Sequence, residues 1–102
     1  MDEPPSPTPT RAMLEGMHTE AIDEGQSFDA ALAQAREVAK QRMAEPMMLA
    51  FWDGSRAHGS PAGACGRDGE PGWMLYAKTR GADLAVHSPD LRFVFLFLDA
   101  EL

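Results

Sequence analysis

Apolar and polar residues recur along residues 27–45 with the spacing of an amphipathic helix. Ser27 is a favourable N-cap, and Asp29 follows in the first turn, where the helix dipole stabilises a negative charge. Pro46 ends the pattern, because the residue before a proline avoids the helical region of the backbone. The apolar stripe of this predicted helix consists of Phe28, Ala31, Leu32, Ala35, Val38, Ala39 and Met43.

Four later segments have the composition of β-strands. Residues 47–52 form an uninterrupted apolar run with an aromatic pair at its end, and residues 73–78 begin with a second tryptophan. Residues 83–87 alternate between polar and apolar side chains, as a half-buried strand does, and residues 92–98 are apolar on both faces. Turn residues such as Gly81 separate the last three segments, which indicates a meander of three strands.

This order of elements predicts an α+β fold, with one main helix packed on a small, mainly antiparallel four-stranded sheet in the order α-β-β-β-β. One helix covers only one face, so the other face of the last strand needs a second cover. We expect either the segment 12–22, whose apolar residues recur at helical spacing, or a second copy of the protein to supply it. Self-association through the sheet would bury Phe93, Val94, Phe95, Leu96, Phe97 and Leu98.

The first 26 residues differ from the remainder and are predicted to form an acidic, proline-rich leader. They contain six acidic residues and one basic residue, so this segment accounts for most of the net charge of −7. Residues 2–10 contain four prolines and no large apolar side chain, so we expect this stretch to be disordered. Residues 12–22 are a possible short helix. Residues 27–102 then form a single α+β domain.

The composition excludes several classes of protein. At 102 residues the chain has room for one domain, and its acidity argues against binding to nucleic acid or to an anionic membrane surface. A single cysteine, Cys65, rules out an intrachain disulfide and a zinc site built from several thiolates. The sequence has no apolar run near the roughly 20 residues of a membrane-spanning helix and no signal-peptide pattern. We therefore expect a soluble, cytoplasmic protein.

A set of short motifs lies between residues 27 and 98. They are Pro46 to Asp53, Cys65-Gly66, Pro71-Gly72-Trp73, Tyr76-Ala77, Arg80 to Leu84 and an aromatic closing strand. These motifs resemble a small uncharacterised family, a domain of unknown function of archaea and anaerobic bacteria. The resemblance implies a fold and no activity. The family pattern often has two adjacent cysteines where this chain has Ala64 and Cys65, which weakens a thiol-pair or metal role there.

A long loop over residues 53–72 contains six glycines and most of the reactive side chains. One hypothesis is a reactive thiol at Cys65, with Arg67 stabilising the thiolate and His58 or His87 acting as the base. No cysteine-enzyme motif supports it, so we interpret Cys65 as a free thiol in a mobile or packed loop and favour a non-enzymatic role over an enzymatic one.

Two other kinds of site in this loop are less well supported. A metal site from Asp53, His58, Cys65 and His87 has no standard ligand spacing. The glycines of residues 63–69 do not form a phosphate-binding loop, because the motif lacks its Gly-Lys-Ser/Thr ending. We therefore predict no metal and no cofactor.

The two tryptophans lie at the ends of this loop. Trp52 and Trp73 would line an aromatic pocket if their strands paired, although ordinary core packing explains them better. With Asp53 and Arg67 they are candidate binding residues for an unidentified small molecule. Our leading prediction is a non-enzymatic association or binding module, in the simplest case a homodimer. The alternative is a ligand-binding protein or enzyme that uses the loop around Cys65.

Overall fold

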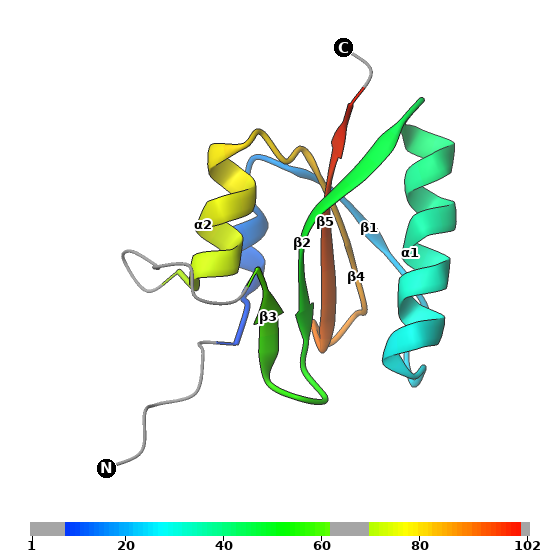
Figure 1. The fold of residues 1–102 in the computed structure, drawn as a ribbon. Helices are drawn as coiled ribbons and strands as arrows, with labels where there is room; N and C mark the ends of the chain where they lie inside the picture. Colours follow the sequence, from blue (N-terminus) through cyan, green and yellow to red (C-terminus); the bar gives the residue numbers. More distant parts are fainter. Residues whose placement is uncertain (1–7, 62–69, 101–102) are drawn as a thin grey trace.

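The computed structural model describes residues 8–61 and 70–100, which form two helical layers on either side of one sheet (Figure 1). In the described chain no helix is long and apolar enough to cross a membrane. The elements are η1 (Arg11–Leu14), β1 (His18–Ala21), α1 (Phe28–Arg42), β2 (Pro46–Asp53), β3 (His58–Ser60), α2 (Gly72–Thr79), β4 (Leu84–His87) and β5 (Phe93–Asp99).

Helix α1 confirms the prediction for residues 27–45, with slightly narrower bounds. The hydroxyl oxygen of Ser27 accepts a hydrogen bond from the backbone N–H of Ala30 at 3.2 Å, as an N-cap should. Met43 is already extended, with φ −129° and ψ 143°, so the helix ends at Arg42, four residues before Pro46.

The sheet contains five strands in the order β1-β4-β5-β2-β3, one more than predicted. The predicted strands at residues 47–52, 83–87 and 92–98 are present as β2, β4 and β5, which pair in antiparallel fashion. β1 adds to β4 in parallel, and β3 forms a hairpin with β2. The α+β class is therefore confirmed, whereas the number of strands was wrong.

Residues 73–78 form helix α2 and not the strand that we predicted. Its buried residues are Trp73, Met74 and Ala77, at positions i, i+1 and i+4, which lie on one face of a helix. The alternation of Trp73, Leu75 and Ala77 also fits a strand. Periodicity in so short an apolar run therefore does not distinguish a strand from a helix. Helix α2 packs on β2 from the face opposite α1, as Figure 1 shows.

The apolar side chains form two cores, one on each face of the sheet. The α1-side core joins the helical alanines to alternate residues of β4 and β5, including Phe93, Phe95 and Phe97. The α2-side core joins Trp73 and its neighbours to the intervening residues, including Val94 and Leu96. Both faces of β5 are thus covered within one chain, which removes our reason for expecting a second copy on the sheet face.

The segment 12–22 differs from the short helix that we expected. It contains one turn of 3-10 helix, η1, whose Leu14 lies in the α2-side core, and then strand β1. The sheet therefore begins inside the stretch that we assigned to the leader. Pairing with β4, which lies more than 60 residues later, decides this conformation.

Candidate functional site

Strand β1 forms one free edge of the sheet. On its inner side, the N–H of His18 donates to the carbonyl of Asp83 and the N–H of Ile22 donates to that of His87, both at 2.9 Å. Backbone groups alternate in direction along a strand, so those of Thr19 and Ala21 point away from β4. His18, Thr19 and Ala21 are exposed and Glu20 is partly exposed. The described part of the chain thus presents an unpaired sheet edge here.

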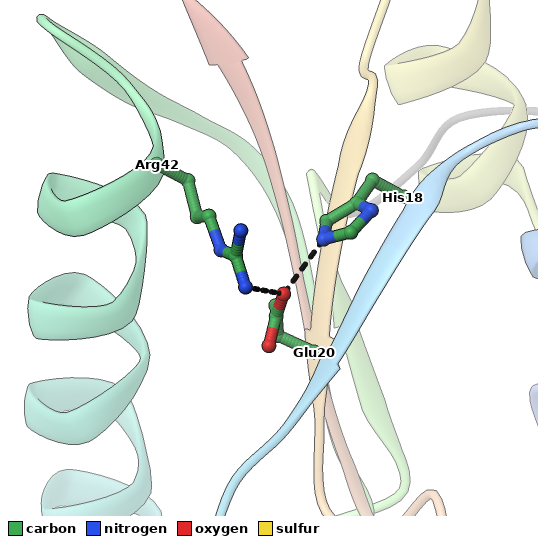
Figure 2. Close-up of polar contacts among 3 residues, drawn as sticks. All are labelled: His18, Glu20 and Arg42. Carbon is green, nitrogen blue, oxygen red and sulfur yellow. Dashed lines mark hydrogen bonds and ion pairs between the residues drawn. The ribbon is translucent and has the colours of Figure 1, made fainter.

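A cluster of charged side chains lies on the α1 side of this edge. His18 Nε2 donates to Glu20 Oε2 at 2.6 Å, and Arg42 Nη2 of α1 contacts the same oxygen (Figure 2). A carboxylate oxygen only accepts hydrogen bonds, so Nε2 of His18 carries the proton in this contact. The cluster joins β1 to the last turn of α1, and we call these three residues the edge cluster.

The edge cluster favours the ionised form of its carboxylate. The hydrogen bond from His18 and the positive charge of Arg42 hold the pKa of Glu20 below its ordinary value of 4.5, against a smaller opposing effect of desolvation. Glu20 is therefore a fixed negative charge at neutral pH.

A surface cavity of about 330 Å³ opens beside the edge cluster, between α1 and the sheet. Asp99, at the end of β5, accepts hydrogen bonds from the N–H groups of Ala44 and Glu45 at 3.3 and 3.1 Å, and this closes the far wall. Asp99 therefore anchors the turn between α1 and β2. The cavity is lined by His18, Arg42, Met43, Asp83, Leu84 and Asp99.

The histidines that we considered as partners of a reactive thiol are placed far apart. His58 is exposed on β3, where its ring lies 6.3 Å from that of Phe51 on the α1 side of the sheet. His87 is buried on β4 and pairs with Val94 of the α2-side core. Three strand spacings separate β3 from β4, about 14 Å, and the two rings lie on opposite faces.

Each of the other candidate residues has a structural role in the described chain. Asp53 is buried at the β2–β3 turn and accepts hydrogen bonds from the backbone and the hydroxyl of Ser55 at 2.9 and 2.5 Å. The Nδ1 of His87 lies 2.8 Å from the carbonyl of Ser88 and must donate to it. Trp52 and Trp73 stack in the core, each 3% exposed, in agreement with their interpretation as core residues.

Cys65 and Arg67 lie outside the described residues, so the hypothesis of a reactive thiol and the favoured interpretation of a free thiol both stay predictions. Among residues 8–61 and 70–100, no three side chains of the histidine, cysteine, aspartate or glutamate type are grouped to hold a metal ion.

The edge cluster was not predicted from the sequence. His18 and Glu20 fall in a segment for which we expected a helix, and Arg42 was not among the candidate residues. No local signal indicated a strand there, because the polar and apolar residues from His18 to Ile22 do not alternate.

Comparison with known proteins places this fold beside a solved structure. The protein AF1514 from Archaeoglobus fulgidus, described as novel, matches with a TM-score of 0.65 and 24% sequence identity, over 81% of this chain and 94% of the other. At that identity the likeness establishes a shared fold. Residues 14–97 also match the sequence model of a domain of unknown function, DUF5619. No curated protein matches the chain.

Proposed function

The chain belongs to the family of the domain of unknown function DUF5619, and on this premise we propose that it is a small association module that self-associates through the free edge of β1. The family match begins at residue 14 and so includes β1 and the edge cluster. The resemblance noted in the sequence is thereby confirmed and extended by more than ten residues towards the N-terminus.

The observation that carries the proposal is that, within residues 8–61 and 70–100, β1 pairs with β4 and with no strand on its other side. Unpaired N–H and C=O groups at a sheet edge are a template for another strand, and native proteins usually cover or distort such an edge. In the described chain β1 contacts chiefly β4, and neither α1 nor α2 lies across its outer side. A strand added here would extend the five-stranded sheet and satisfy the outward groups of Thr19 and Ala21.

The sheet faces are poor candidates for the same role. Phe93, Val94, Phe95, Leu96 and Phe97 are each at most 3% exposed within one chain. Met47 is the large apolar residue with substantial exposure among the described residues, at 43%, and it stands alone. Association through the edge of the sheet therefore replaces the sheet-face dimer of the sequence-based prediction.

A four-residue edge supports only a weak and reversible contact. Interfaces that bury less than about 1,200 Å² are typical of transient complexes. We therefore expect a monomer–dimer equilibrium that depends on protein concentration, and not a permanent dimer.

The test removes the outward backbone donor of the edge without touching its inner side. Thr19→Pro deletes an N–H that points away from β4, a position where a sheet tolerates proline. Sedimentation velocity over a range of concentrations should show dimers for the native chain and for the matched control Thr19→Val, but not for Thr19→Pro. Circular dichroism should confirm that all three are folded. A native chain that stays monomeric at the highest measurable concentration would overturn the proposal.

A further inference from the structure

We infer that two copies dock antiparallel with Thr19 on the two-fold axis, so that His18 of each copy lies opposite Glu20 of the other. This inference rests on the proposed self-association and specifies its geometry. It makes the edge cluster the part of the molecule that selects the register of the pairing.

The direction of the backbone groups limits the possible registers. The backbone N–H and C=O groups of Thr19 and Ala21 point outward, away from β4. In an antiparallel pair, two residues whose backbone groups both point towards the partner strand must lie opposite each other to exchange hydrogen bonds. A closed dimer of identical chains has a two-fold axis, which relates the two edge strands in antiparallel orientation. The central pair is then Thr19 with Thr19, Thr19 with Ala21, or Ala21 with Ala21.

The charges on the α1 side distinguish these three registers. With Thr19 on the axis, His18 faces Glu20 of the second copy, and this favourable pair occurs twice. With Thr19 opposite Ala21, the two copies of Glu20 face each other, and like charges directly opposite are destabilising. With Ala21 on the axis, Glu20 faces Ile22, an apolar side chain that is already buried at 3% exposure.

The side chains on the other face agree with the first register. There, Thr19 of one copy lies opposite Thr19 of the other, and threonine pairs across strands are favourable. Ala21 lies opposite Met17, which packs at the border of the α2-side core. Uncharged residues therefore face uncharged residues on this side, while the imidazole of His18 meets the carboxylate of Glu20 on the other.

The edge cluster also leaves polar atoms available to the second copy. The contacts from His18 and Arg42 both end on Oε2 of Glu20. In the described chain Oε1 of Glu20 and Nδ1 of His18 make no hydrogen bond with each other or with another residue. In the imidazolium form of His18, Nδ1 also carries a proton and can donate it to Oε1 of Glu20 in the other copy. Arg42 holds the carboxylate in place, which reduces the side-chain entropy lost on docking.

Single cysteines at the edge distinguish the registers. In a Cys65→Ser background, Thr19→Cys would put two thiols on the axis, with Cα atoms about 5.5 Å apart in a hydrogen-bonded pair. This spacing lies within the range of disulfides. Ala21→Cys is the matched control, because its two copies would be offset by four residues, about 13 Å. Mild oxidation should convert Thr19→Cys to a covalent dimer and leave Ala21→Cys monomeric.

The other outcomes distinguish a wrong register from a wrong proposal of self-association. Cross-linking of Ala21→Cys alone, or only in a mixture with Thr19→Cys, would overturn the register while the edge dimer stands. A native chain that sediments as a monomer, with no cross-link in either variant, would overturn the proposed function and the register together.

A variant that changes the charge at His18 tests the same register independently. His18→Glu replaces two favourable pairs by two repulsive ones and should weaken the dimer by about tenfold, which corresponds to about 1.4 kcal/mol. His58→Glu, at the exposed histidine on the opposite edge, is the control and should leave the dimer unchanged. Equal effects of the two variants would overturn the assignment of His18.

Discussion

Trp52 and Trp73 stack with their ring centroids 5.9 Å apart and their planes inclined by 18°, which fastens α2 to β2. Both rings are buried, and Gly59 of β3 lies against the edge of Trp73. The α2-side core therefore depends on a contact between two tryptophans and a strand position without a side chain.

Gly59→Ala should destabilise the fold, because its methyl group would lie 2.0 Å from Cδ1 of Trp73. The ring is held by Trp52 and has little room to move, so we expect the loss typical of an overpacked core, about 1–3 kcal/mol. Urea unfolding measures it, with Ser60→Ala on the same strand as a control that adds no atoms. A stability equal to that of the native chain would show that Trp73 shifts freely.

Leu96→Ala should lower the free energy of unfolding by about 2–5 kcal/mol, because this side chain is fully buried in the α2-side core. The exposed Met47→Ala is the control, with an expected change within about 0.5 kcal/mol. The loss should already be present at protein concentrations at which the chain sediments as a monomer, since one chain covers Leu96. A loss found only at concentrations at which the chain dimerises would instead indicate a cover from a second copy.

Ser27→Ala should destabilise α1 by about 0.5–2 kcal/mol, because it removes the acceptor for the N–H of Ala30. Ser27→Asp retains an acceptor at the N-cap and adds a charge that the helix dipole favours, so it should preserve stability. Chemical denaturation of the three proteins checks the order. Equal losses in the two variants would contradict a capping role.

Stability should fall in acid through Glu20 and Asp90. The pKa of Asp90 is held below its ordinary value of 3.8 by hydrogen bonds from the backbone of Arg92 and the hydroxyl of Ser88. The pKa values of both groups are lower in the folded chain than in the unfolded chain. Their contribution is therefore complete above the ordinary values of 4.5 and 3.8 and is lost as the pH falls through the folded ones.

The variants Glu20→Gln and Asp90→Asn test this linkage. Each should reduce the difference between the unfolding free energies at pH 7 and pH 3, and the double variant should reduce it further. A dependence on pH identical to that of the native chain would show that other groups cause the acid loss.

The sequence by itself determined the elements whose signals are local. Helix α1 has an N-cap at Ser27, a complete apolar stripe and a proline beyond its end, and all three act within the segment. β2, β4 and β5 were equally predictable from their runs of apolar and aromatic residues. Knowledge of these elements was enough to establish the α+β class.

Only the tertiary structure decided α2, β1 and the edge cluster. An eight-residue apolar segment is too short to be a stable helix alone, so the conformation of Gly72–Thr79 is decided by its packing on β2 and Trp52. The four residues of β1 become a strand through hydrogen bonds to β4, far along the chain. His18, Glu20 and Arg42 then meet because that strand and α1 lie side by side, which no local pattern records.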